Sequence, residues 1–288
     1  MMHYALVLLA TVLLAFEFAF SRKYQTVEGT AMSAGLRFNM LTGLFTAVIF
    51  FGLNGFRLEF SSFSVLLVAL SAVCATAYNV ISFPILKAGG MTLYSTFLML
   101  GGMLLPYGYG VLFLDEPLTV WRILGVAVIA VAVVLSTKAS FKVSPWVYGL
   151  CAVVFLLNGG VSIFSKLHQI EASHATVSTT AFVMYGGLAR FLLSAGALLV
   201  QGKRAEKPKS SFPWILGIAA GAAAISGISY LLQLTGAKEL PATVLYPMVT
   251  GGSIIFSALS GRVFFKERLS IWQLISIGLC FAGTLLFL

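Results

Sequence analysis

Charged residues are scarce in this chain. Asp, Glu, Lys and Arg make up 9% of its 288 residues, against about 25% in a typical soluble domain, and hydrophobic residues make up 59%. This imbalance excludes an ordinary water-soluble protein. The 18 Lys and Arg exceed the 9 Asp and Glu, giving a net charge of +9, but they are scattered singly between apolar runs. A nucleic-acid-binding face needs clustered cations, so we expect no nucleic-acid partner.

Cysteine and histidine are also few. The three cysteines, Cys74, Cys151 and Cys280, lie in separate apolar runs without metal-ligand spacing, and the three histidines form no i, i+4 pair. We therefore expect no metal site. The GxSxG, HExxH, Walker and GxGxxG motifs are absent as well. The sequence thus predicts a protein that is not an enzyme and needs no cofactor.

Long apolar runs occupy most of the chain. A membrane-spanning helix needs roughly 20 apolar residues, and the runs between polar breaks give ten candidate spans. They cover about residues 2–20, 31–52, 63–86, 90–114, 119–137, 145–166, 175–200, 213–236, 241–263 and 270–288. We expect an all-α polytopic membrane protein whose partners include the lipid bilayer. The first run has no basic segment or cleavage site, so we assign it as the first helix rather than a signal peptide.

An internal repeat divides the chain. A shift of 151 residues superposes residues 87–135 on residues 238–286, and rare residues then coincide. These pairs include Lys87 with Lys238, Glu116 with Glu267, and Trp121 with Trp272. We predict two five-helix repeats, residues 1–140 and 141–288. Because five is odd, the second repeat enters the membrane in the opposite direction, which predicts inverted repeats around a central cavity, as in alternating-access transporters.

A family resemblance begins at the helix hairpins. Leu114-Asp115-Glu116-Pro117-Leu118, followed by Gly125, is similar to an acidic hairpin of the drug/metabolite transporter (DMT) superfamily, in its EamA-type ten-helix branch. Phe265-Lys266-Glu267-Arg268-Leu269 resembles the second copy, and Arg37 and Lys23 resemble further family positions. The resemblance implies a carrier with a central cavity, commonly an exporter of amino acids, cationic drugs or other small metabolites.

Some details differ from the family pattern. Ala15-Phe16 stands where an aromatic-glycine pair is usual, and Ser276 replaces the glycine that would match Gly125. The hairpin acids Glu116 and Glu267 have basic neighbours. We expect both acids to be solvated or to form salt bridges within their hairpins.

Glu17 is the strongest single candidate for function. It is an acid about three residues inside the first predicted span, where a carboxylate costs roughly 2.5–3.5 kcal/mol and should face a cavity or a partner. It could bind an ammonium group, carry a proton or pair with an arginine, and proton coupling requires a carboxyl group that titrates near neutral pH. The alternative is a helix that ends early, with Glu17 in the headgroup region beside Arg22 and Lys23.

Two arginines need partners inside the membrane. Arg190 lies near the middle of the seventh predicted span, and Arg37 lies at the start of the second. A cation at such a depth must meet an acid, a carbonyl group or water. Glu17 is one possible partner of Arg190, but bonding to carbonyl groups is the favoured interpretation. We therefore assign Arg37 and Arg190 as structural charges.

Polar and aromatic residues within the spans could line one cavity. Asn158 and two following glycines interrupt the sixth span, and the 151-residue shift matches Tyr78-Asn79 with Ser229-Tyr230. The predicted substrate-binding residues are Glu17, Tyr78, Asn79, Phe83, Tyr94, Asn158, Tyr230, Gln233 and Tyr246. Aromatic faces beside a carboxylate suit an organic ammonium, since each cation–π contact contributes about 0.5–2 kcal/mol. For each aromatic residue alone, lipid-facing packing is the alternative.

These observations favour a secondary transporter in a bacterial-type cell (inner) membrane. We expect it to move, and most often export, a small organic solute such as an amino acid or organic amine, with proton antiport through Glu17. The small-molecule substrate and protons would be its partners, and the protein would be a monomer or homodimer. The alternatives are an uncoupled facilitator or exchanger and, from another class, a polytopic intramembrane enzyme or a receptor subunit.

The orientation has two interpretations. The family resemblance implies a cytoplasmic amino terminus. In that orientation the cytoplasmic connections hold four Lys and Arg, and the opposite side holds twelve. The positive-inside rule predicts the reverse, with both termini outside.

Overall fold

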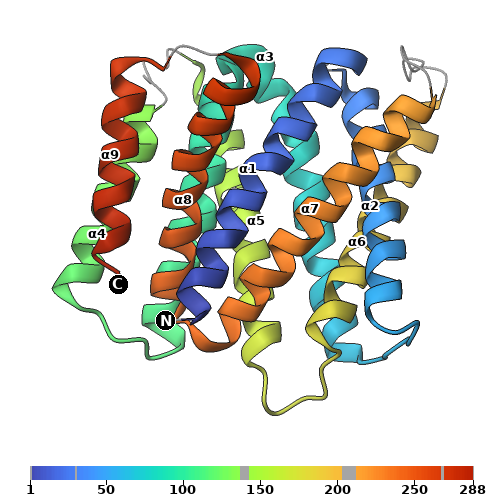
Figure 1. Cartoon of the computed structure of the whole chain (residues 1–288), viewed down its shortest axis with the longest axis horizontal. Helices are drawn as coiled ribbons and strands as arrows, with labels where there is room; N and C mark the ends of the chain where they lie inside the picture. The colour runs from blue at the N-terminus through green and yellow to red at the C-terminus, as the bar shows by residue number, and fades with distance from the viewer. Residues whose placement is uncertain (1, 30, 137–142, 203–211, 267–268, 288) are drawn as a thin grey trace.

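The protein is an all-α bundle. A computed structural model describes residues 2–29, 31–136, 143–202, 212–266 and 269–287, and the regular elements of these ranges are α-helices (Figure 1). They are α1 (Met2–Glu28), α2 (Met32–Leu53), α3 (Ser62–Phe113), α4 (Val120–Ser136), α5 (Pro145–Ile170), α6 (Thr179–Gln201), α7 (Phe212–Glu239), α8 (Ala242–Phe265) and α9 (Ile271–Leu285). The predicted all-α polytopic fold is confirmed.

One long helix contains two membrane spans. Eight helical segments of the described chain are long and apolar enough to cross a membrane, and α4 and α9 are shorter apolar helices. Two of the eight, Ser62–Ser82 and Leu93–Phe113, belong to α3. Both ends of α3 lie at the lower edge of the bundle, so its two arms run in opposite directions (Figure 1). The helical backbone is continuous through residues 87–89, but the two spans predicted on either side of them, 63–86 and 90–114, are confirmed as separate crossings.

The first helix is longer than its apolar run. The predicted span ends at residue 20, whereas α1 continues to Glu28. Arg22 and Lys23 lie on this extension with exposed side chains, and such long side chains reach the membrane surface while the backbone stays helical. Glu17 therefore lies well inside α1, and the alternative of an early helix end is wrong.

Helix starts carry recognisable local signals. The hydroxyl groups of Ser61, Ser178 and Ser270 accept hydrogen bonds from the first turns of α3, α6 and α9. Pro145 occupies the first turn of α5, where its missing N–H costs no hydrogen bond. At its other end α8 stops at Lys266, which adopts the left-handed conformation.

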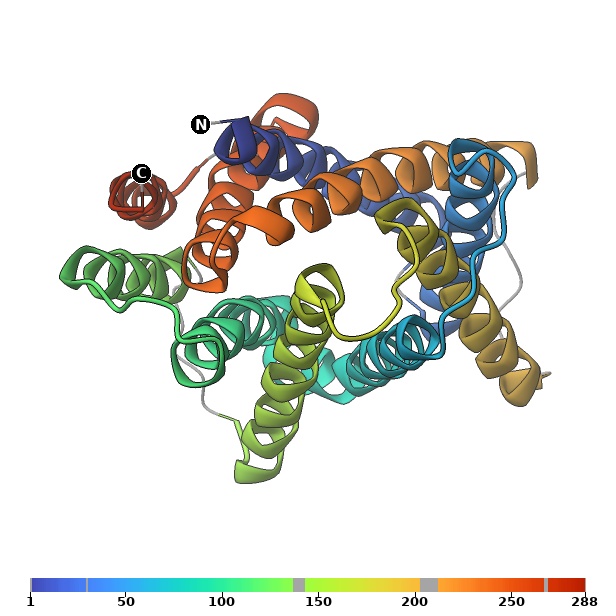
Figure 2. The same ribbon diagram turned by 90° about the horizontal axis from the view of Figure 1, so that it is seen from below.

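The main helix contacts join helices of the first half of the chain to helices of the second half. α1 packs on α7 and α8, α5 packs on α3, α2 packs on α6, and α4 packs on α9 (Figure 2). The α2–α6 crossing is close because glycine lies on both sides. A Cβ atom on Gly43 would stand 2.7 Å from the backbone nitrogen of Phe191, and one on Gly187 would stand 2.9 Å from the Gly43 carbonyl oxygen. Small residues of this kind allow membrane helices to approach closely.

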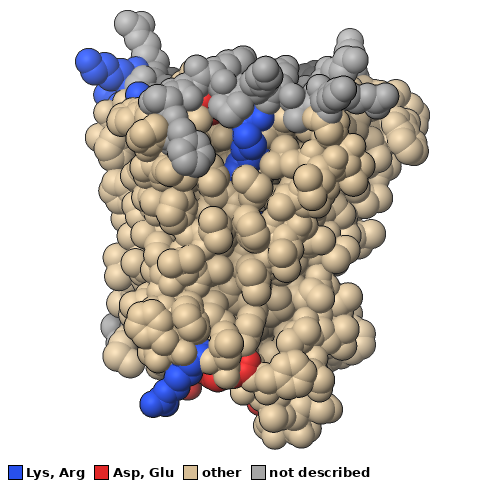
Figure 3. Space-filling view, turned by 90° about the vertical axis from the view of Figure 1, so that its right-hand side faces the viewer, with Lys and Arg blue, Asp and Glu red and all other residues tan. Residues whose placement is uncertain are grey.

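Charged side chains gather at the two ends of the bundle. Both chain termini lie at the lower edge in Figure 1, and we call this side the terminal face. Figure 3 shows a broad uncharged band with charges above and below it. Arg57 lies in the α2–α3 connection and Arg122 in the first turn of α4, on the terminal face, whereas Arg22 lies near the end of α1 and Arg262 in the last turn of α8, on the opposite face. This band matches the apolar interior of a bilayer.

The charge distribution predicts the orientation. In the span assignment from sequence, twelve Lys and Arg fall on the side opposite the termini and four on the terminal side, so the positive-inside rule predicts that the terminal face lies outside the cytoplasm. A fluorescent protein fused after Leu288 should stay dark, and an exported phosphatase fused there should be active. The same reporters fused between α4 and α5 should give the inverse pattern. A fluorescent fusion after Leu288 would contradict this prediction and support the orientation that the resemblance implies.

Candidate functional site

Two opposite charges lie at middle depth in the bundle. Arg190 is at the midpoint of α6, and Glu17 is two residues past the midpoint of α1. The charge of Arg190 acts on the Glu17 carboxylate. Yet no hydrogen bond or ion pair of 4 Å or less joins either side chain to another residue of the described chain. Ionisable groups at this depth usually pair with one another or face water or a solute pathway.

Glu17 is enclosed by protein but is not fully buried. Its side chain is surrounded by protein, yet part of its surface remains accessible. Tyr78 and Tyr230 show the same combination.

Tyrosines from three helices lie within electrostatic range of the two charges or of one another. Tyr78, on the first arm of α3, is within electrostatic reach of Arg190, Glu17 and Tyr230. Tyr230, on α7, is also within reach of Arg190. Tyr246 on α8 lies near Tyr230, and Tyr94 on the second arm of α3 lies near Tyr78. The structure thus brings Glu17, Tyr78 and Tyr230 together with Arg190, and Tyr94 and Tyr246 extend the cluster.

A row of small polar groups on α5 holds two of these tyrosines. The hydroxyl groups of Tyr230 and Ser165 are hydrogen-bonded at 2.7 Å, and the Tyr246 hydroxyl donates to the Ser162 carbonyl oxygen. Our sequence reasoning did not identify Ser162 or Ser165. The available signal was their helical spacing, which places them on the same face as Asn158.

The predicted amide groups have partners within the protein. Asn158 Nδ2 donates to the Leu98 carbonyl oxygen at 2.7 Å and so joins α5 to α3. Asn79 Nδ2 donates within its own helix at 2.9 Å, and Gln233 Nε2 donates to the Ser229 hydroxyl group at 3.3 Å. In this conformation these amide nitrogens therefore support helices. The side chain of Phe83 lies outside the part of the chain that the structure describes.

Arg37 belongs to an ion pair on the opposite face. Its guanidinium lies 3.6 Å from the Glu28 carboxylate, which is 1% exposed. Tyr24 packs beside them, with its ring centroid 4.6 Å from that of Phe38. These contacts join the end of α1 to the start of α2 at the opposite face.

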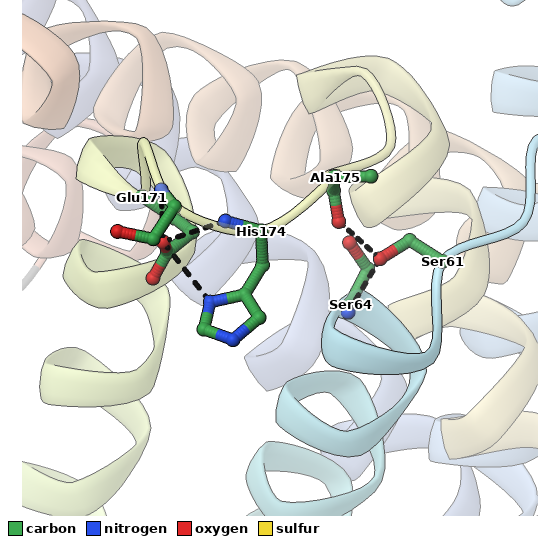
Figure 4. Close-up of polar contacts among 6 residues, drawn as sticks. Ser61, Ser64, Glu171, His174 and Ala175 are labelled. Carbon is green, nitrogen blue, oxygen red and sulfur yellow. Dashed lines mark hydrogen bonds and ion pairs between the residues drawn. The ribbon is translucent and has the colours of Figure 1, made fainter.

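The α5–α6 connection crosses the terminal face. Residues 171–178 pass beneath the middle of the bundle (Figure 2). The Ser61 hydroxyl donates to the Ala175 carbonyl oxygen, and the Ser64 hydroxyl accepts from the Val177 N–H at 3.0 Å. Figure 4 shows Ser61 and Ser64, at the start of α3, facing this connection. The connection is therefore tied to α3 by both a side-chain donor and a side-chain acceptor.

Glu59 attaches the same α5–α6 connection to the connection between α2 and α3. Its carboxylate accepts from the Ser178 N–H at 2.5 Å, the Ser178 hydroxyl at 2.7 Å and the Asn54 amide at 3.1 Å. Partial burial acts to raise the pKa of Glu59, but these hydrogen bonds outweigh it and lower the pKa. Glu59 therefore stays ionised and keeps the α2–α3 and α5–α6 connections together.

The hairpin acid Glu116 caps a helix. Its carboxylate accepts from the N–H groups of Ala242 at 2.6 Å and Thr243 at 2.8 Å, at the start of α8. The expectation of a solvated or hairpin-paired Glu116 is wrong, because the unpaired N–H groups and positive dipole at a helix start attract a carboxylate. Its repeat partner Glu267 lies outside the described residues.

A separate hollow of about 190 Å³ lies between α1 and α8. Its lining consists of Val12, Ala15, Phe16, Phe256, Leu259, Ser260, Val263 and Phe264. Because this lining has no charged group, the hollow differs from the surroundings of Glu17 and Arg190.

Comparisons with known proteins identify the family. Residues 144–288, just over half of the chain, match the model of the EamA-like transporter family. No curated protein matches. A solved structure titled only "Crystal structure of protein" superposes with a TM-score of 0.76, covering 98% of this chain and 97% of that one at 16% identity. This likeness shows a shared fold, and the family match shows that the chain belongs to the EamA-like transporter family of membrane proteins.

Proposed function

We propose that the protein is a secondary transporter that moves, and in the cell exports, a small organic solute such as an amino acid or an organic amine. The observation that carries this proposal is the presence of two ionisable side chains, Glu17 and Arg190, at middle depth in a membrane bundle, without a hydrogen bond or ion pair to another residue of the described chain. Ionisable groups at that depth are costly and typically line a solute or ion pathway.

The helix pairing supports two inverted halves, residues 1–140 and 141–288. α1, the first span of one half, packs on α7 and α8, the third and fourth spans of the other half. α5, the first span of its half, packs on α3, which contains the third and fourth spans of the first half. The second spans pair with each other, as do the fifth, and α1 and α5 cross in opposite directions (Figure 1). Halves related by a two-fold axis in the membrane plane would pair in this way.

Each face has a contact that must open during alternating access. On the terminal face it is the attachment of residues 171–178 to Glu59, Ser61 and Ser64. On the opposite face it is the ion pair between Arg37 and Glu28. In our proposal these contacts break in turn, so that the region of Glu17 and Arg190 opens to one side at a time.

The coupling of solute movement to proton movement would depend on Glu17. Its carboxylate would exchange a proton for the solute, which makes the protein an antiporter of the bacterial-type inner membrane. The solute would leave chemically unchanged, and no cofactor would take part. Lipid, solute and protons would be the partners of a monomer or homodimer.

Counterflow tests this function. Proteoliposomes containing purified protein are preloaded with one unlabelled amino acid or amine, and the same radiolabelled compound is added outside. We expect transient accumulation of label above its equilibrium level for at least one compound, with protein-free vesicles as the control. Mass spectrometry should recover the compound unaltered. Folded protein that shows no counterflow across the panel, or that converts a compound, would refute transport.

A further inference from the structure

The hollow between α1 and α8 opens onto the outer surface of the bundle. Of the residues that line it, Phe16, Val263 and Phe264 are 38%, 69% and 53% exposed. Both helices are long and apolar enough to span the membrane, so an outer surface at this depth faces the bilayer rather than water. The hollow is therefore accessible from the lipid.

The crossing of α1 and α8 creates the hollow. A Cβ atom on Gly252 would stand 2.7 Å from the Thr11 hydroxyl oxygen, so the two helices are in close contact at this level. They separate toward the opposite face (Figure 1), and the hollow begins at Val12, directly after this contact. Phe16 and Phe264 then meet across it, with ring centroids 5.7 Å apart. The hollow is thus bounded by a close helix contact and by an aromatic pair.

The lining of the hollow suits a hydrocarbon chain. The one hydroxyl group among the lining residues, that of Ser260, donates to the Ser257 carbonyl oxygen at 3.0 Å. A polar solute would lose its hydration in such a place without gaining hydrogen bonds in return. Methylene groups have no such loss and make dispersion contacts with the lining.

Exposed cations lie beyond the hollow, toward the opposite face. Lys23 is seven residues past Phe16 on the same side of α1, which is about 10 Å further along the helix. Lys266 follows Phe264 by two residues, and Arg262 lies in the last turn of α8. The side chains of all three cations are exposed. The surface at this end of the hollow is therefore positively charged.

We propose that the hollow binds one acyl chain of an anionic phospholipid, whose phosphate group lies against Lys23 and Lys266. Cations near the membrane surface attract anionic lipids, and each strengthens binding about fivefold. The predicted orientation places this end of the hollow in the cytoplasmic leaflet, which contains anionic lipids. The inference goes beyond the proposed function, because it does not depend on which solute is moved.

Two lipids with the same acyl chains test the role of the cations. Purified protein is titrated with phosphatidylglycerol, which is anionic, or with phosphatidylethanolamine, which is zwitterionic, and bound lipid is counted by native mass spectrometry. We expect phosphatidylglycerol to bind at least fivefold more tightly. Lys23→Gln and Lys266→Gln should each weaken its binding about fivefold and leave phosphatidylethanolamine unchanged. Arg57→Gln, which removes an exposed cation of the terminal face, should bind both lipids as wild type does.

Ser260 provides a test of the hollow itself. Ser260→Leu places a larger apolar side chain in the hollow and should weaken phosphatidylglycerol binding at least fivefold, whereas Ser260→Ala keeps the space and should bind as wild type does. A phosphatidylglycerol with a photoactivatable diazirine on its acyl chain should label residues 12–16 and 256–264 of the wild-type protein. This labelling needs no variant, so it tests the site even if Ser260→Leu does not fold.

Several outcomes would overturn the proposal. Equal binding of the two lipids by wild-type protein would remove the role of the cations, and normal phosphatidylglycerol binding by folded Ser260→Leu would remove the role of the hollow. Labelling confined to other helices would place the lipid elsewhere. A wild-type dimer that Ser260→Leu converts to a monomer, without loss of bound lipid, would assign the hollow to a second copy of the chain. Each of these results leaves the counterflow test of transport unaffected.

Discussion

Replacing Glu17 by Gln is expected to abolish the pH change that solute movement drives in proteoliposomes. Gln keeps the size and hydrogen-bonding capacity of Glu but cannot take up a proton near neutral pH. At saturating solute each cycle would then carry the solute alone. A pH-sensitive dye inside the vesicles should report a signal no larger than that of protein-free vesicles, whereas counterflow at high solute concentration should remain measurable.

Two variants control this experiment. Glu17→Asp keeps a carboxylate at middle depth and should retain coupling, although the shorter side chain should slow it. Glu239→Gln removes an exposed carboxylate at the end of α7 and should behave as wild type. A pH change of wild-type size in Glu17→Gln would place the proton on another group. Wild-type protein that shows counterflow without any pH change would be an uncoupled facilitator or exchanger.

Gly101→Ala is expected to destabilise the bundle where α3 meets α5. A Cβ atom at this position would lie 2.2 Å from the carbonyl oxygen of Phe155 and 2.7 Å from its Cα atom. Because both are backbone atoms, the two helices must separate, and this strains the neighbouring hydrogen bond from Asn158 to Leu98. Overpacking of this kind costs about 1–3 kcal/mol. We expect the thermal unfolding temperature, measured by tryptophan fluorescence, to fall by roughly 5 °C or more.

Gly108→Ala is the matched control on the same helix. A Cβ atom there would meet nothing within 4 Å, and alanine is a better helix former than glycine by roughly 0.5–1 kcal/mol. The unfolding temperature of this variant should equal or slightly exceed that of wild type. An equal fall in unfolding temperature for the two variants would contradict a close backbone contact between α3 and α5 at Gly101.

The helices and their ends follow closely from local sequence patterns. Apolar runs predict the membrane spans because a bilayer selects for length and apolarity. Serines at 61, 178 and 270 and the proline at 145 define helix starts by local hydrogen bonding. The structure differs at residues 21–28, where two cations suggested a helix end but their long side chains reach the membrane surface while the backbone stays helical. At residues 87–89 the spans on either side are separate as predicted, although the backbone between them stays helical.

The site was only partly predictable. Glu17 is conspicuous because an acid inside an apolar run is costly. The roles of Glu116 and Ser165 depend on contacts with α8 and with Tyr230, which are distant in the chain. Arg190 presents the same difficulty, because an isolated cation in a span is equally compatible with carbonyl partners and with a ligand.

The sequence by itself determined that this chain is a helical membrane protein of about ten spans with one acid deep in its first helix, because hydropathy and the cost of a buried charge are local properties. Only the tertiary structure decided that α1 and α6 bring Glu17 and Arg190 within reach of each other and of Tyr78. Helix packing depends on the complementary shapes of surfaces that are far apart in the chain. No pattern within a single span specifies which partner it meets.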